Sequence, residues 1–214
     1  EAVKNLAKGE ELGKKAGEKA AARRVAGTRP SHPIANYAGT YFHPGYGQLK
    51  VNLKDGKLSF TYNEITTPLD HWHYDTFNGL KSDDPVFEDA KLTFQTDPNG
   101  RVAGLTVPLE PTADDIVFKK RPDERYYDPE FLKKFTGNYV LLNQASTVSL
   151  QGNTLTFYVP GQPLYELVPD LGDEFYLKQA PLIRVRFIFG PKGEVTGLET
   201  IQPNGVFEFK KMEK

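Results

Sequence analysis

Residues 37–41 read Tyr37-Ala38-Gly39-Thr40-Tyr41, and residues 135–139 read Phe135-Thr136-Gly137-Asn138-Tyr139. An aromatic residue, a glycine and a tyrosine therefore return at the same spacing. Further along, Leu92-Thr93-Phe94 returns as Val185-Arg186-Phe187, and Phe118-Lys119-Lys120 returns as Phe209-Lys210-Lys211. A long internal period is read before any local pattern because it decides the architecture. The sequence predicts two consecutive copies of one folding unit.

Within each copy, apolar and polar residues alternate with a period of two. Residues 49–53 read Leu-Lys-Val-Asn-Leu, which is the pattern of a half-buried strand. Asp55-Gly56 and Gly152-Asn153 suit tight hairpins because their residues tolerate positive φ angles. Short strands that repeat at close spacing between such turns indicate a sandwich or a barrel.

A barrel is the better interpretation of the strand number. A sheet of about eight strands can close around an interior filled by side chains or by one small ligand, and closure removes the exposed edges. We therefore expect an all-β chain with two tandem, small, antiparallel up-and-down barrels of the lipocalin or streptavidin kind. The expected boundaries are residues 30–124 and residues 125–214. One barrel built jointly by both copies is less favoured, because each copy has its own set of turns.

Residues 1–29 are rich in Ala, Lys and Glu and are interrupted by Gly. This composition predicts a solvated linker helix that precedes the first barrel. A chain that begins at Glu1 with such a segment is expected to be the C-terminal part of a longer polypeptide; the alternative is a processed mature protein.

Composition excludes several classes of protein. With 214 residues and 38% hydrophobic residues, the chain has enough apolar mass for a core. Its net charge of −1 lacks the excess of positive charge that nucleic-acid-binding proteins use to contact phosphates. It has no cysteine, so disulfides and thiolate metal sites are excluded. No apolar run approaches the roughly 18 residues that a membrane span needs. We expect neither a nucleic-acid partner nor a membrane span.

Motifs for catalysis are missing from the sequence. None of the five serines is followed three residues later by lysine, so the Ser-x-x-Lys motif of β-lactamase-type enzymes is absent. The Gly-x-Ser-x-Gly motif, the P-loop and the dinucleotide fingerprint are absent as well. We expect no catalytic residue, no cofactor and no enzymatic activity in this chain.

Histidines give one possible metal site. His71 and His73 are two residues apart, so their side chains would share one face of a strand. His43, Asp70 or Asp75 could supply a third ligand for zinc. The alternative is that the histidines pack among aromatic rings and bond to carbonyl groups.

The aromatic content also allows a ligand site in the first barrel. Mostly apolar pockets with a few polar groups are typical small-molecule sites. The alternative is that large rings fill a small barrel. The candidate ligand-binding residues are Tyr41, Tyr46, Phe60, Tyr62, His71, Trp72, His73, Tyr74 and Phe77.

Three stretches resemble a known family: residues 37–47, the hairpin Asp55-Gly56-Lys57-Leu58, and residues 69–77, which read Leu-Asp-His-Trp-His-Tyr-Asp-Thr-Phe. They are similar to the domain of unknown function appended to the C-terminus of serine β-lactamase-like hydrolases, which are relatives of penicillin-binding proteins. The second copy resembles lipocalin-like C-terminal domains of the same enzymes, among which D-aminopeptidases carry two tandem barrels. The resemblance covers residues 34–120 well and residues 128–212 more loosely.

The resemblance implies a non-catalytic accessory module. Its partner would be the catalytic serine-hydrolase domain of the same polypeptide, on which it would pack to shape substrate access or oligomerisation. A periplasmic or extracytoplasmic location is implied as well. The family's catalytic residues carry over to no position here. The connections at residues 78–90 and 108–115 are expected to reach toward such a domain. The alternatives are the binding of a small apolar ligand and a metal-dependent activity at His43, His71 and His73.

Overall fold

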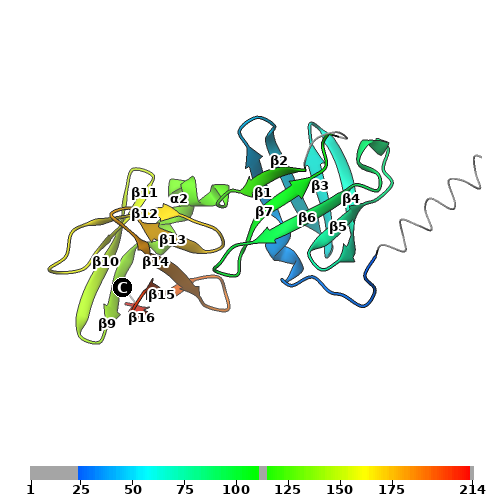
Figure 1. Cartoon of the computed structure of the whole chain (residues 1–214). Helices are drawn as coiled ribbons and strands as arrows, with labels where there is room; N and C mark the ends of the chain where they lie inside the picture. The colour runs from blue at the N-terminus through cyan, green and yellow to red at the C-terminus, as the bar shows by residue number, and fades with distance from the viewer. Residues whose placement is uncertain (1–23, 111–114, 213–214) are drawn as a thin grey trace, which may run out of the picture. The chain divides into compact units, whose positions relative to one another are not determined.

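The computed structural model describes residues 24–110 and 115–212. It confirms an all-β chain with two closed, eight-stranded antiparallel barrels in tandem (Figure 1). The chain divides into two compact units, of which the first ends at Lys119 and the second begins at Lys120. None of the helices formed by the described residues has the length and hydropathy that a membrane-spanning helix needs.

In the first barrel each strand pairs with the next along the chain, which is the up-and-down order. Its strands are β1 (Gly39–His43), β2 (Gly47–Lys54), β3 (Lys57–Tyr62), β4 (Ile65–His73), β5 (Thr76–Gly79), β6 (Lys91–Thr96), β7 (Val102–Val107) and β8 (Ile116–Lys120). The 3₁₀-helix η1 (Ile34–Tyr37) comes before β1, and η2 (Pro85–Phe87) lies between β5 and β6.

The second barrel repeats this order, and β16 pairs with β9 to close it. Its strands are β9 (Gly137–Leu141), β10 (Gln144–Gln151), β11 (Thr154–Tyr158), β12 (Tyr165–Pro169), β13 (Glu174–Leu177), β14 (Ala180–Phe189), β15 (Val195–Gln202) and β16 (Gly205–Lys211). Three short helices precede β9: η3 (Glu124–Tyr127), α2 (Pro129–Leu132) and η4 (Lys133–Phe135).

Two ends can be defined in each barrel because consecutive strands alternate in direction. We call the end at which the short helices enter the first strand the helix end. In the second barrel it also holds the connections β10–β11, β12–β13 and β14–β15. We call the other end, which holds the remaining connections, the loop end. The same division applies to the first barrel.

The linker helix predicted for residues 1–29 lies outside the described residues as far as residue 23. For residues 24–29 the prediction is wrong, because they form no helix. Gly27 has a φ angle of 76°, in the left-handed region, which a right-handed helix does not use. Part of the predicted connection 108–115 also lies outside the described residues, namely residues 111–114.

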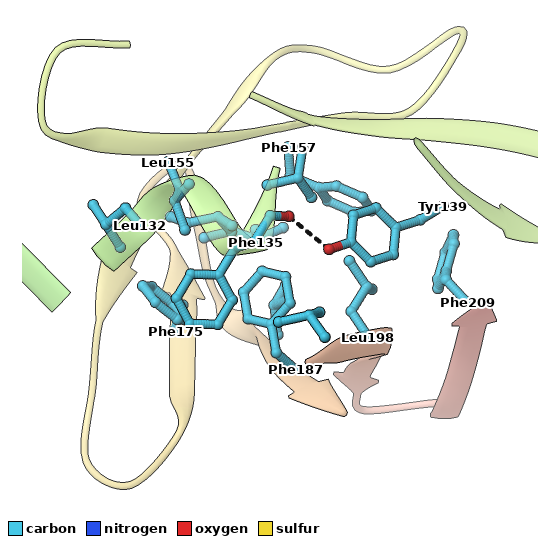
Figure 2. Packing of buried hydrophobic residues seen from close by; sticks show 14 of the residues in the cluster. Leu132, Phe135, Tyr139, Leu155, Phe157, Phe175, Phe187, Leu198 and Phe209 are labelled. Carbon is cyan, nitrogen blue, oxygen red and sulfur yellow. Dashed lines mark hydrogen bonds between the residues drawn. The ribbon is translucent and has the colours of Figure 1, made fainter. Parts of the chain in front are cut away.

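The repeated motif has the same structural role in both barrels. The hydroxyl of Tyr41 donates to the carbonyl of Tyr37 over 2.7 Å, and the hydroxyl of Tyr139 donates to the carbonyl of Phe135 over 2.6 Å (Figure 2). The glycine between them has a φ angle of 140° at Gly39 and 143° at Gly137. Residues with a Cβ atom avoid this conformation, so the motif requires glycine.

Each barrel interior is filled by its own aromatic and aliphatic side chains. In the second barrel, the ring of Phe135 packs against Phe187 with centroids 4.5 Å apart, and Phe175 packs against Phe187 at 5.6 Å (Figure 2). In the first, Tyr37 packs against Phe94 at 4.9 Å. Tyr37, the last residue of η1, and Phe135, the last residue of η4, thus lie in the cores of their barrels at the helix end.

Candidate functional site

The nine residues predicted to bind a ligand separate into three groups. Tyr41, Phe60 and Phe77 belong to the buried core of the first barrel. Tyr41 and Phe60 are 0% exposed and Phe77 is 2% exposed. These three rings are packing residues, because their surfaces are covered by neighbouring side chains.

Tyr46 and Tyr62 form the second group, at the loop end. The hydroxyl of Tyr62 donates to the backbone carbonyl of Tyr46 over 3.0 Å, and the hydroxyl of Tyr46 donates to the carboxylate of Glu110. The ring of His43 lies against Tyr46 with centroids 5.1 Å apart and against Phe118 at 5.8 Å. These contacts connect the turn between β1 and β2 to its neighbours.

The third group, His71, Trp72, His73 and Tyr74, lies near the helix end. The pairing of β4 with β5 shifts register between His71 and His73. Two histidines at this spacing share a face only on a strand with regular alternation, and a bulge interrupts that alternation. The Nε2 atom of His71 lies 2.9 Å from the carbonyl oxygen of Tyr74, and the Nδ1 atom of His73 accepts from the backbone N–H of Val25 over 3.4 Å.

The structure does not bring the three candidate metal ligands together. His43 ends β1 at the loop end, whereas His71 and His73 lie in the last part of β4, near the helix end. Residues 24–110 and 115–212 contain no group of three or more His, Asp or Glu side chains that could hold a metal ion.

Trp72 has two cations near its ring. The guanidinium carbon of Arg24 is 5.6 Å from the ring centroid, and the Nζ atom of Lys91 is 4.3 Å from it. Arg24 also donates from Nε to the carbonyl of Trp72 over 2.7 Å and from a terminal nitrogen to the carbonyl of His71 over 2.9 Å. Cation–π contacts of this kind add a modest attraction to the hydrogen bonds.

Asp75, in the turn between β4 and β5, collects three hydrogen bonds. Ser31 donates its backbone N–H over 2.8 Å and its hydroxyl over 2.6 Å, and the hydroxyl of Tyr37 donates as well. Residues far apart in the sequence therefore meet on one carboxylate. Asp75 is a possible metal ligand in the sequence, whereas nothing there points to Ser31, because no motif or spacing connects the two residues.

The segment that carries Ser31 is attached to the barrel at several further points. We call residues 24–33 the strap. The backbone N–H of Tyr74 donates to the hydroxyl of Thr28 over 3.1 Å, and the Nε2 atom of His32 lies 3.0 Å from the hydroxyl of Thr96. Together with Arg24, these contacts hold the strap against the helix end of the first barrel.

Ser31, His32 and Asp75 include the residue types of a hydrolytic triad, but their hydrogen bonds differ from one. A triad needs a serine hydroxyl bonded to histidine and a histidine bonded to the acid. Here the hydroxyl of Ser31 donates directly to Asp75, and the ring of His32 bonds to Thr96. This arrangement fastens the strap to the barrel.

The hydrogen bonds also set the protonation of Asp75 and Tyr37. Burial alone would raise the pKa of Asp75, but the bonds from Ser31 and Tyr37 outweigh burial and lower that pKa below its ordinary value. Burial and the bond to Asp75 raise the pKa of Tyr37 to about 12. Near neutral pH the pair is a carboxylate and a neutral phenol, which is the state that forms the bond.

The second barrel has a related bond at its own helix end. Tyr126 in η3 donates its hydroxyl to Asp173 over 2.5 Å, and Asp173 lies in the connection between β12 and β13. The corresponding connection in the first barrel contains Asp75. Phe135 takes the position of Tyr37 in the repeat and has no hydroxyl, so a tyrosine from a different helix makes the bond.

A shallow cavity of about 270 Å³ lies beside these helices in the second barrel. Leu132, Leu155, Leu167 and Phe175 contribute apolar surface to it, and Tyr127 and Lys178 also line it. None of the residues predicted for a ligand site belongs to it.

Comparison with known families adds one finding. Residues 23–120 match the model of a domain of unknown function (DUF3471). The first barrel and the strap therefore form a DUF3471 domain. No curated protein matches the chain.

Proposed function

We propose that the two barrels are a non-catalytic accessory module of a serine β-lactamase-like hydrolase whose catalytic domain belongs to the same polypeptide. The observation that carries this proposal is the attachment of the strap to the first barrel through Arg24, Thr28, Ser31 and His32. A segment held at four residues has a fixed path along the helix end of the first barrel. A flexible linker would need none of these bonds.

The hydrogen bonds made by the polar side chains near the strap support the same role. The serine, histidine and aspartate that lie near one another are bonded as structural groups, and the rings of the first barrel pack against one another in its core. These observations favour an accessory module over an enzyme or a carrier with a ligand inside a barrel. The resemblance of residues 69–77 to domains appended to such hydrolases points the same way.

In this role the barrels pack on the catalytic domain, and their connecting loops shape the access of substrate to it. Loops on rigid scaffolds are the usual carriers of such contacts. The connection between β5 and β6 is a candidate because η2 and a run of acidic residues lie in it.

The test starts from the purified 214-residue chain with nitrocefin and with aminoacyl p-nitroanilides. We expect no turnover above the buffer rate. Ser31→Ala is the informative variant, because Ser31 lies beside both a histidine and an aspartate, and Ser149→Ala on the exposed face of β10 is its matched control. Turnover that is lost with a serine-directed inhibitor and in Ser31→Ala, but not in Ser149→Ala, would contradict the proposal.

The second part of the test concerns the attached enzyme. The reading frame upstream of Glu1 should encode Ser-x-x-Lys, and deletion of both barrels from that polypeptide should change its KM or its thermal stability while hydrolysis persists. A reading frame without the motif, or a deletion with no effect on either quantity, would refute the accessory role.

A further inference from the structure

The loop end of the second barrel carries most of the large exposed apolar side chains of that unit. Leu142 is 90% exposed and Leu182 is 81% exposed, and Val206, Leu164 and Tyr158 are also exposed there. They come from all four connections at this end or from strand residues next to them. Exposed apolar residues gathered in one place mark interaction sites more often than scattered ones do.

Charge is nearly absent from the same end. The four connections, residues 142–143, 159–164, 178–179 and 203–204, contain one ionisable side chain, Lys178. It is paired with Glu166 over 2.7 Å. Depletion of charge is the compositional mark of the centre of a protein–protein interface.

Two of the corresponding connections of the first barrel are rich in charge. Residues 63–64 and 80–90 contain Glu64, Lys81, Asp83, Asp84, Glu88 and Asp89, although Leu80 and Val86 are also exposed there. The fold is the same in both copies, so the barrel itself does not require a neutral loop end. The lack of charge at the second barrel's loop end therefore has a cause other than folding.

Leu142 shows this at a single position. It is the first residue of the two-residue turn between β9 and β10, and its φ angle is 55°. Asn, Asp and Gly adopt this conformation most readily, and Asp55 and Asn63 occupy such positions in the first barrel with φ angles of 51° and 46°. Leucine does not stabilise this turn, because its φ angle is positive. It does not stabilise the core either, because its side chain is 90% exposed.

We propose that the loop end of the second barrel is the surface through which two copies of this chain form a dimer. A two-fold interface places the same patch on both sides, so any net charge there would face its own copy. A neutral patch avoids that repulsion. The side chains of Asn143 and Asn204 at its turns have both donors and acceptors, so they can bond to their own copies across the axis. The inference does not depend on the attached enzyme.

The experiment is sedimentation velocity of the 214-residue chain over a wide range of concentration. The wild type should show a monomer–dimer equilibrium. Leu142→Asn and Leu182→Asn should each weaken the dimer by about tenfold or more, because each removes a leucine from the buried contact. Asparagine tolerates a positive φ angle, so Leu142→Asn should unfold at the same temperature as the wild type or higher. Loss of dimer in that variant therefore does not result from unfolding.

Val86→Asn is the matched control, because Val86 is 64% exposed and lies in the first unit. It should leave the dimer constant unchanged. Hydrogen exchange at residues 142–143 and 204–206 should slow as concentration rises. A wild type that stays monomeric at every concentration overturns the proposal. A dimer that survives when Leu142→Asn and Leu182→Asn are combined, or that weakens equally in Val86→Asn, overturns it as well.

Discussion

Asp75 shows how one side chain can hold a segment that precedes a barrel. Its carboxylate accepts three hydrogen bonds, two from Ser31 and one from Tyr37. Bonds to a charged acceptor are stronger than bonds between neutral groups. The carboxylate is only partly buried, so solvent reduces the gain.

We expect Asp75→Asn to lower the free energy of unfolding of the first barrel by about 1 kcal/mol near neutral pH. The pKa of Asp75 is lowered in the folded protein, so its contribution is present above the ordinary aspartate value and is lost as the pH falls through the folded value. The wild type should therefore lose stability in acid, and the variant should lose less. Urea unfolding at a series of pH values measures both.

At high pH, the expected change in the free energy of unfolding comes from Tyr37. Its pKa rises from 10.0 to about 12 in the folded protein, so its contribution is present below pH 10 and is lost as the pH rises toward 12. Asp70→Asn, at an exposed position of β4, is the control for Asp75→Asn and should unfold like the wild type at neutral pH. Identical pH profiles for Asp75→Asn and the wild type would show that the carboxylate does not hold the strap.

Ser146 gives a second residue-scale prediction. It lies opposite Tyr139 in the pairing of β10 with β9, where the first barrel has Leu49 opposite Tyr41. Ser146 is 1% exposed, and its hydroxyl has no hydrogen-bond partner among the described residues. We expect Ser146→Ala to raise the free energy of unfolding by up to about 1 kcal/mol, because a buried unpaired hydroxyl is costly.

The control for this prediction is Thr156→Val. Thr156 is 2% exposed, but its hydroxyl donates to the carbonyl of Ser149 over 3.3 Å, so its removal should not stabilise the protein. Chemical denaturation of both variants gives the comparison. A loss of stability in Ser146→Ala would show that this hydroxyl is bonded in solution.

At the scale of elements, the join between each short helix and the first strand depends on a glycine. Gly39 follows η1 and Gly137 follows η4, and both have φ angles that alanine adopts only with strain. The joint lets the chain turn from the helix into the strand while the tyrosine two residues later bonds back to the helix carbonyl.

Gly39→Ala and Gly137→Ala should each destabilise their own barrel by about 1–3 kcal/mol, which is the usual cost of a residue held in a rarely populated backbone conformation. Gly45→Ala is the control, since a Cβ atom there would have ordinary 3.6 Å contacts with the ring of His43. Urea unfolding curves measure the three variants. Stabilities equal to that of Gly45→Ala would mean that the joint relaxes without cost.

At the scale of the whole molecule, each barrel has a hydrophobic core of its own. The buried cluster of the second barrel runs from Tyr126 to Phe209 and contains no residue of the first. The cluster of the first runs from Tyr37 to Phe118. A self-contained core is the condition for a unit to fold alone.

We expect residues 120–214 to fold as an isolated fragment with cooperative unfolding, observed by circular dichroism and by dispersed NMR signals. For the first barrel, residues 24–120 and residues 34–120 form a matched pair that differs by the strap. The longer fragment should be the more stable, because the strap bonds are then present. A second-barrel fragment without fixed side-chain signals would show that its core needs the rest of the chain.

The sequence by itself determined the two-barrel architecture and the repeated aromatic–glycine–tyrosine joint. Both follow from patterns that are local or that repeat, such as alternation with a period of two and a glycine at a fixed distance from a tyrosine. Neither depends on which distant side chains meet. The expected filling of the barrels by large rings was one of two interpretations that composition allowed.

Only the tertiary structure decided which side chains are partners. Ser31 and Asp75 are bonded because closure of the barrel brings the β4–β5 turn to the strap, and no spacing in the sequence encodes that contact. The same holds for the loop end of the second barrel. Leu142, Leu182 and Val206 lie at one end because their strands alternate in direction around a closed sheet, although each looks unremarkable in the sequence.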